Sequence, residues 1–360
     1  MSLGLYLHIP YCFSKCRYCD FYSAPGQRGV PRAYVDALLR GAFPLCVGRA
    51  PAAGHPLLRR RQPQPARPRR RCPAHRRCSA PAGAEITLEA NPETVTEASL
   101  QAFRAAGVNR ISFGVQSARD SQLKTLGRPT PQSRPVRPLP PHAGPGSRTS
   151  AATSCWPCPH YTQAEFDETL ELIEEGGATH ISAYLLKDRA GLRLWPDAPG
   201  GSAHLRRAAD FYLYAVEQLE HHGYLQYEIS NFARPGYEGK HNLIYWDCGD
   251  YLGIGPPPTP AWAANGSTTR PTPKAFLRDE AAPVMDGGCG AEDYLILQLR
   301  LRKGPEPRRI QKRYGREFST AQLAFVQNCV KSGYASFDGH TLAPHPAGLI
   351  VQNSILAELL

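Results

Sequence analysis

The stretch YLHIPYCFSKCRYC, residues 6–19, decides the fold that we predict for this chain of 360 residues. Its first half is apolar and belongs to a buried strand over 3–10. Its second half carries three cysteines in the spacing C-x3-C-x2-C, namely Cys12, Cys16 and Cys19. Thiolates are the usual protein ligands of iron–sulfur clusters. Three of them in a loop after a buried strand predict a [4Fe–4S] site.

Three thiolates leave one iron of such a cluster without a protein ligand. S-adenosylmethionine (SAM) can chelate that iron through its amino and carboxylate groups, and an electron passed to its sulfonium produces a deoxyadenosyl radical. The alternative is a structural zinc loop, which closes with four ligands. No further Cys or His follows closely after Cys19. The spacing therefore favours a radical SAM site over zinc.

Hydrophobic periodicity along the chain alternates between strands and helices. We expect strands over 3–10, 85–91, 110–117 and 180–186, and helices over 32–43, 96–106, 162–175 and 205–222, with a short helix ending near 126. Thr96 and Thr162 are expected N-caps, and Gly107 is an expected helix stop. This alternation predicts a parallel sheet with its functional residues at the carboxyl ends of the strands. From about Ala291 the pattern changes to helices and a short strand pair.

Composition narrows the setting of the protein. No run of 18 apolar residues occurs, so no stable membrane span is expected. The first residues lack the basic and apolar regions of a signal peptide. We therefore expect a cytoplasmic protein with reduced thiols, in which eleven cysteines favour metal ligation over disulfides.

The net charge of +11 is concentrated in two unusual tracts. Ten arginines and no acidic residue lie between positions 46 and 81, and three more arginines lie between 129 and 160. Without these tracts the chain would be slightly acidic. The tract 59–77 has no interleaved aromatic residues for base stacking, so we expect no nucleic-acid partner. The CWPC sequence at 155–158 resembles a thioredoxin redox motif but lacks the surrounding βα pattern.

Several blocks of sequence resemble one family in the order in which that family has them. The blocks are 6–12, 15–21, 85–92, 107–116, 127–128, 180–187, 227–232 and 241–246. Together they resemble the coproporphyrinogen dehydrogenase family of radical SAM proteins, and specifically its HemW-type heme-chaperone branch, over about three quarters of the chain. The resemblance implies a partial (β/α)6 barrel of the α/β class with a small, mostly helical C-terminal accessory domain.

By that resemblance, Tyr6, Glu89, Gln116 and Arg128 match positions that contact SAM. An arginine at the position of Arg128 can pair with the SAM carboxylate, and Glu89 and Gln116 end strands, where they can bind an ammonium or a ribose hydroxyl. Tyr18 lies between two ligands and can pack against the adenine. Taken singly, each of these residues is as readily a surface, capping or loop-packing residue.

Residue 21 distinguishes the heme-chaperone branch of this family from the coproporphyrinogen dehydrogenases. The coproporphyrinogen dehydrogenases have a further cysteine there, and this chain has Phe21. The block HNLIYW, 241–246, is typical of the chaperone branch, and the resemblance implies heme as cargo with His241 as a candidate iron ligand. A lone histidine beside an asparagine is otherwise an ordinary polar residue. We thus expect heme or porphyrin and an unidentified heme-acceptor protein as partners. Oxidative decarboxylation of coproporphyrinogen III is the alternative activity.

Four family motifs are missing: G-G-G-T-P after the second strand, an acidic strand end before His160, I-E-P-G after Lys187 and A-H-S after Gly255. Codon choices exist under which a shifted reading frame restores each of them. We therefore interpret 46–81, 129–158 and 188–200 as frameshifted or disordered, and expect the two basic tracts to be irregular. A third reading of the chain is an inactive product of a frame-damaged gene. The expected domains are 1–235, a connecting segment 236–290 and 291–360.

Overall fold

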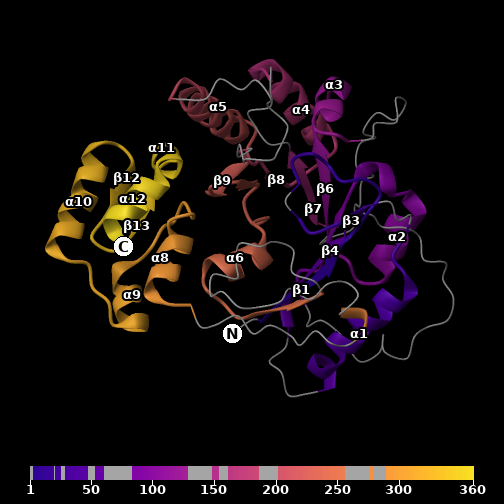
Figure 1. The fold of residues 1–360 in the computed structure, drawn as a ribbon. Coiled ribbons are helices and arrows are strands. Elements are labelled where there is room, and N and C mark those ends of the chain that lie inside the picture. The colour runs from indigo at the N-terminus through magenta and orange to yellow at the C-terminus, as the bar shows by residue number, and fades with distance from the viewer. Residues whose placement is uncertain are drawn as a thin grey trace.

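The computed structural model describes residues 3–19, 21–25, 29–47, 53–60, 83–128, 148–153, 161–185, 202–255, 276–278 and 289–360. Within these ranges the chain forms a large α/β unit and a smaller C-terminal group of helices, which Figure 1 shows to one side of the sheet. None of the helices in the described ranges combines the length and apolar character needed to cross a membrane.

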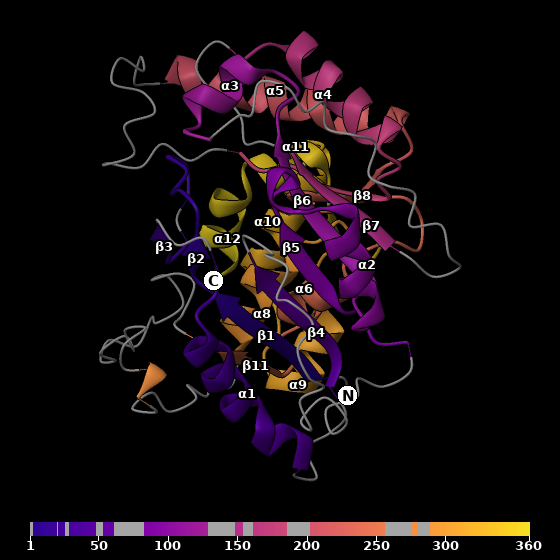
Figure 2. The ribbon, with the colours of Figure 1, turned by 90° about the vertical axis from the view of Figure 1, so that its right-hand side faces the viewer.

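A nine-stranded sheet organises the large unit in the order β11-β1-β4-β5-β6-β7-β8-β10-β9. Its strands are β1 (Leu3–Ile9), β4 (Ala53–Arg60), β5 (Thr87–Ala90), β6 (Arg110–Gln116), β7 (Arg148–Thr153), β8 (His180–Ser182), β9 (Leu225–Glu228), β10 (Asn231–Ala233) and β11 (Tyr251–Ile254). The ladders from β11 to β8 are parallel, and β10 pairs antiparallel with both β8 and β9. In Figure 2 these strands cross the middle of the view, with the C-terminal helices behind them.

Helices between the strands follow from local signals in the sequence. The helices of the large unit are α1 (Arg32–Val47), α2 (Glu97–Ala105), α3 (Asp120–Thr125), α4 (Gln163–Glu175), α5 (Ser202–His221) and α6 (Lys240–Trp246). Thr96 and Thr162 each form a capping box with the residue three positions later, Ser99 and Glu165, which satisfies two otherwise unpaired backbone amides. The expected starts of α2 and α4 are confirmed, and Gly107 ends α2 at a φ of +101°.

The main core lies between the sheet and the helices α4 and α5. Phe113, Phe166, Ile181, Leu219 and Tyr224 are each 2% exposed or less and belong to one cluster. Burying a side chain of this size contributes about 1.5–3 kcal/mol. This core fixes β6 and β8 against their helices and therefore fixes where those strands end.

Two strands lie inside the tracts that we expected to be irregular. The segment 53–60 is β4, which pairs parallel with β1 and β5, and 148–153 is β7, which pairs parallel with β6 and β8. For these segments the expectation is wrong. Strand pairing uses backbone groups that every residue other than proline supplies, so a βα series can accept a strand without hydrophobic patterning. Residues 46–47 end α1, and the rest of both tracts, together with 188–200, lies outside the described residues.

The C-terminal unit confirms the expected small, mostly helical domain. It comprises α8 (Ala291–Gln298), α9 (Pro307–Tyr314), α10 (Thr320–Lys331), β12 (Ala335–Phe337), β13 (Leu342–Pro344), α11 (Pro346–Ile350) and α12 (Gln352–Leu359). It has its own apolar cluster. Residues 300–302 fasten it to the outer edge of β9: the Ile229 amide donates to the Arg300 carbonyl, and the Arg302 amide donates to the Tyr227 carbonyl.

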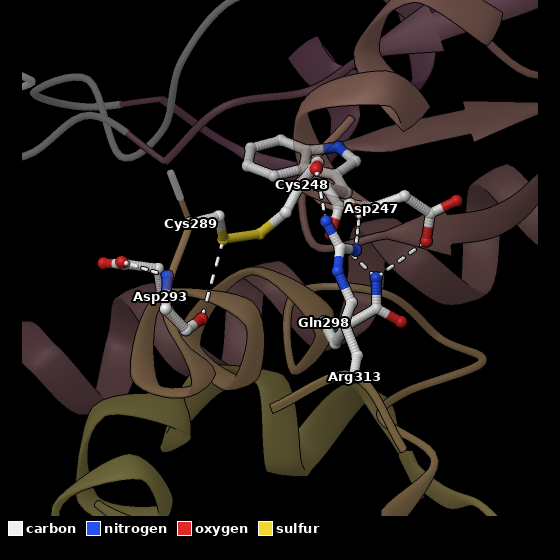
Figure 3. The surroundings of a disulfide bond; sticks show 8 residues. Asp247, Cys248, Cys289, Asp293, Gln298 and Arg313 are labelled. Atoms are coloured by element: carbon white, nitrogen blue, oxygen red, sulfur yellow. Dashed lines mark hydrogen bonds between the residues drawn. A yellow bond between two sulfur atoms is a disulfide. The ribbon is translucent and has the colours of Figure 1, made fainter. Parts of the chain in front are cut away.

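A disulfide joins Cys248, two residues after α6, to Cys289, two residues before α8 (Figure 3). This pair corrects the expectation of reduced thiols. The backbone around Cys248 is held against the C-terminal unit by Gln298, which donates to the side chain of Asp247, and by Arg313, which donates to the carbonyls of Asp247 and Cys248. These contacts place the two cysteines beside each other.

Candidate cofactor site

The cysteine loop leaves the carboxyl end of β1 through the short strand β2 (Tyr11–Cys12), which pairs with β3 (Ala24–Pro25). Cys12 and Cys19 are buried, and Cys16 is partly exposed. The Cys19 amide donates to the Cys16 carbonyl at 3.2 Å, and the Phe21 amide donates to the Cys19 sulfur at 3.3 Å. The loop is therefore folded back on itself with its last thiol turned inward.

The donor set of this loop fits an iron–sulfur cluster, because it offers three thiols within eight residues. Across the described ranges, however, no three His, Cys, Asp or Glu side chains meet in a metal-binding arrangement. The structure thus brings Cys12, Cys16 and Cys19 into one loop but does not converge their sulfur atoms. Ligand convergence of this kind is coupled to metal binding itself.

The loop docks on the turn that follows α3. The Arg17 amide donates to the Leu126 carbonyl at 3.0 Å. Gly127 has a φ of +70° and packs against the side chain of Arg17. A Cβ added to Gly127 would lie only 2.9 Å from the Cγ of Arg17. Only glycine avoids both the backbone strain and this clash. The GR pair at 127–128 therefore places the cysteine loop directly beside Arg128.

Arg128 is buried at the carboxyl edge of the sheet and is held by three partners. Its guanidinium donates to the Gly114 carbonyl of β6, to Asn91 Oδ1 at 2.7 Å and to Glu93 Oε1 at 3.5 Å. Asn91 and Glu93 follow β5. We did not single out either residue from the sequence, although N-P-E directly after a strand is a recognisable signal for polar groups at a strand end.

Gln116 ends β6 at a φ of +71°, in the left-handed region that non-glycine residues seldom adopt. Such backbone conformations persist where the surrounding structure enforces them, and they are common at functional sites. The side chain is buried and its Nε2 lies close to Gly114, the residue that also accepts from Arg128. Glu89, one residue before the end of β5, is half-buried and lies in register with Ser112 of β6.

Tyr6 and Tyr18 are the two remaining predicted SAM contacts. Tyr6 lies on β1 with its hydroxyl 3.0 Å from His8 Nδ1, and His8 Nε2 in turn lies 3.0 Å from the Tyr22 carbonyl. These contacts tie β1 to the segment after the cysteine loop. Tyr18 is partly exposed within the loop. The loop, Gln116 and Arg128 therefore converge, while SAM contacts remain predictions for all five residues.

His241 lies at the opposite edge of the sheet. The His241 ring packs against Gly4, near the start of β1, since a Cβ added to Gly4 would lie 3.4 Å from the ring. The ring is 1% exposed, and its Nε2 lies 2.6 Å from the Tyr245 hydroxyl. Heme ligation by His241 stays a prediction. Ligation through Nε2 would require this hydrogen bond to break, and ligation through either nitrogen would require the ring to become exposed.

A buried ion pair anchors the helix that carries His241. Glu85 accepts from Arg110 at 3.1 Å and from the backbone amides of Lys240 and His241 at 3.2 Å each. Burial opposes ionisation of Glu85, but the Arg110 guanidinium and the two amides outweigh it and hold its pKa below the ordinary value. The negative charge sits at the N-terminus of α6, where a helix favours it.

A second buried carboxylate lies at the carboxyl end of β9. Glu228 is 0% exposed and accepts from the Asn231 amide and, at 3.0 Å, from the Ser230 backbone. Its other oxygen, Oε2, has no hydrogen-bond partner within the described part of the chain. Burial raises the pKa of Glu228 to about 7, although the nearby Arg300 lowers it in part.

The chain is similar to several known proteins. Residues 6–136 match the Radical SAM superfamily. The heme chaperone HemW of Escherichia coli is 35% identical over 271 residues, covering 70% of this chain and 68% of its own. The bovine mitochondrial Radical S-adenosyl methionine domain-containing protein 1 is 31% identical over 273 residues, but the match spans only 59% of its length.

Among solved structures, the chain is similar to coproporphyrinogen III oxidase (HemN) from Escherichia coli, a radical SAM enzyme. The TM-score is 0.72 at 18% identity, and the match covers 99% of this chain and 90% of the other. At this identity the likeness shows the fold, and it confirms the predicted radical SAM barrel with a C-terminal domain.

Proposed function

The chain belongs to the HemW family of radical SAM proteins, and from this membership we propose that it binds a [4Fe–4S] cluster and SAM at the carboxyl edge of its sheet and carries heme to an acceptor protein in the cytoplasm. The observation that carries the cofactor part is the docking of the cysteine loop on the turn that precedes Arg128. It joins the predicted metal ligands and the predicted SAM-binding arginine in one place.

The residues at this edge have complementary roles in the proposal. Cys12, Cys16 and Cys19 would hold the cluster, which supplies an electron to the SAM sulfonium when bound. Arg128 presents a fixed guanidinium that can pair with the SAM carboxylate. Gln116 can accept from and donate to the polar groups of SAM. Glu89, on β5, can accept from an ammonium or a ribose hydroxyl. The neutral aromatic rings of Tyr6 and Tyr18 can enclose the adenosyl part.

Heme as cargo is supported by the relatives, several of which are heme chaperones, and by Phe21 in place of the cysteine expected of the dehydrogenase branch. His241 is the candidate iron ligand. Its buried ring and its hydrogen bond with Tyr245 mean that ligation must be accompanied by a local opening of α6.

The alternative, oxidative decarboxylation of coproporphyrinogen III, is opposed by Phe21. Damage to the gene, the third reading, would leave the chain without either activity.

Anaerobic reconstitution tests the proposal. The protein is loaded with iron and sulfide, then titrated separately with SAM and with heme, and its absorption and electron paramagnetic resonance spectra are recorded. We expect a cluster signal that SAM perturbs, a heme Soret band, and no conversion of coproporphyrinogen III. Conversion would identify a dehydrogenase instead. A cluster that SAM leaves unperturbed, with no heme bound, would indicate the damaged product.

A further inference from the structure

Basic side chains gather around a hollow of about 620 Å³ on the C-terminal unit. It is lined by residues of α9 and the residue that precedes this helix: Glu306, Arg308, Arg309, Lys312 and Arg313. Four cations thus face one carboxylate. This concentration lies outside the two basic tracts, so the charge of those tracts does not account for it.

Few carboxylates neutralise these cations. Asp247 lies 3.9 Å from Arg309, and it is also 3.3 Å from Lys303, so one carboxylate is shared. Arg313 donates to backbone carbonyls, which carry no formal charge. Within the described ranges Arg308 and Lys312 form no ion pair, and both are exposed. The hollow therefore keeps a surplus of positive charge that an anion can satisfy.

Two of the guanidinium groups are held in place before any ligand arrives. Arg309 and Arg313 lie 5.6 and 5.7 Å from the centre of the Tyr294 ring, and Arg313 also lies 5.2 Å from that of Tyr314. Such cation–π contacts restrict an arginine while leaving several of its N–H groups available. Figure 3 shows Arg313 reaching the backbone at Asp247 and Cys248. Binding of a carboxylate here would therefore cost little additional side-chain entropy, because the two arginines are already restricted.

The lining also indicates what kind of ligand fits. None of the five lining residues is aromatic or aliphatic, so the hollow has no aromatic or aliphatic side chain on which a porphyrin ring or a run of bases would pack. Ile310, the aliphatic residue of α9, is 1% exposed and faces the core. The helix therefore has no apolar face to insert into a lipid surface. Arginine forks match carboxylates and phosphates alike in geometry and charge, so the choice between these anions is left to the measurement below.

We propose that the basic hollow on α9, defined by Arg308, Arg309, Lys312 and Arg313, is a docking site for an acidic segment of a partner protein. If the chain delivers heme as proposed above, the acceptor protein is the natural owner of that segment. Binding of the acidic segment to these cations does not require heme to be bound.

The test uses the full chain and a fluorescein-labelled glutamate homopeptide. Carbodiimide coupling joins a carboxylate to a lysine in direct contact, so mass spectrometry of the coupled protein reports the site. We expect the peptide on Lys312, and much less on Lys331, an exposed lysine of α10 in the same domain. In fluorescence anisotropy, the Arg308→Glu/Lys312→Glu variant should bind the peptide at least about tenfold more weakly than wild type at low salt, because two attractive charges become repulsive.

A matched variant, Arg104→Glu/Lys331→Glu, makes the same charge change on exposed residues of α2 and α10 and should bind as wild type does. Equal loss in both variants, or coupling spread evenly over the lysines, would overturn the proposal. So would tighter binding to anionic phospholipid vesicles or to duplex DNA than to the peptide. Heme titration of the same variants keeps the proposals separate, because a chain that binds the peptide at Lys312 but no heme contradicts only the heme proposal.

Discussion

Arg128 donates a 2.7 Å hydrogen bond to Asn91, although 37 residues separate them in the chain. The bond joins the loop after β5 to the turn after α3, and the same guanidinium also reaches the Gly114 carbonyl of β6. One side chain thereby links the carboxyl ends of two adjacent strands. Gly127, which adjoins Arg128, packs against Arg17 of the cysteine loop. The position of the loop therefore depends on the hydrogen bonds of Arg128.

Replacing Arg128 by lysine should weaken SAM binding by at least about tenfold, since a charge-assisted hydrogen bond contributes roughly 1.5–3 kcal/mol. A lysine keeps the charge but has a single nitrogen, which cannot reach Gly114, Asn91 and a ligand carboxylate together. Equilibrium dialysis of SAM against the reconstituted protein measures this. Arg119→Lys, at an exposed pair with Glu168, should leave the affinity unchanged.

The three loop cysteines should be required together. Replacing any one by serine leaves two thiolates for a cubane, so each variant should hold much less iron than wild type after anaerobic reconstitution. Cys329→Ser, at a buried cysteine of the C-terminal core, is the matched control and should retain iron. Full iron content in all three single variants would show that these thiols are not the ligands.

Sequence reasoning succeeded where a local rule sets the structure. Thr96 and Thr162 cap their helices through contacts within four residues, so the sequence alone locates both starts. The strand-then-cysteine pattern at 6–19 likewise located the candidate site. The strands β4 and β7 differ from the expectation of irregular tracts, because their proline- and arginine-rich segments lack the hydrophobic pattern by which a strand is recognised in a sequence.

Contacts between residues far apart in the chain could not be predicted from the sequence. No local pattern shows that Cys248 and Cys289 meet, because their approach depends on Gln298 and Arg313 from the other unit. His241 is a similar case. Its motif makes it a candidate heme ligand but does not indicate that packing against β1 buries it at the amino edge of the sheet. Burial of a polar residue depends on tertiary contacts that a single sequence does not display.

Tyr245→Phe separates the two roles open to His241. The variant removes the hydroxyl that engages Nε2 and leaves the ring packing in place. If His241 ligates heme, releasing Nε2 should keep or strengthen heme binding, and His241→Ala should abolish it while the iron–sulfur spectrum persists. If His241 is structural, His241→Ala should lower the free energy of unfolding by about 1–3 kcal/mol, through loss of a buried hydrogen-bonded group, without changing heme affinity. Heme titration and urea unfolding of both variants distinguish these outcomes.

Restoring the shifted frame over 51–56, so that the segment encodes G-G-G-T-P, should raise SAM affinity. If the acidic strand end before His160 is restored as well, two or three hydrogen bonds to charged groups return, which at about 1.5–3 kcal/mol each amounts to at least about a hundredfold. The affinity is again measured by equilibrium dialysis. A chain restored only over 258–274 is the control. Equal affinity before and after restoration would mean that the tracts are true insertions.

Glu228 should make the stability of the protein depend on pH in an unusual direction. Burial raises its pKa to about 7 in the folded protein, whereas an unfolded glutamate titrates near about 4.3. Between these values the folded state retains a proton that the unfolded state has released. The free energy of unfolding therefore falls as pH rises through this window, by up to about 3.5 kcal/mol, and the loss is nearly complete at about pH 7.

Glu228→Gln should remove this dependence, because the amide keeps the shape of the side chain and the acceptor for Asn231 and Ser230 but cannot ionise. Relative to wild type, the variant should therefore gain about 1–3 kcal/mol of unfolding free energy between about pH 5 and about pH 8. Urea unfolding at both pH values measures the difference. Glu97→Gln, at an exposed position in the first turn of α2, is the matched control and should show no comparable gain. A parallel shift of both variants with pH would mean that Glu228 ionises in the folded protein without the burial penalty, for instance by pairing its free Oε2 with the nearby Arg300.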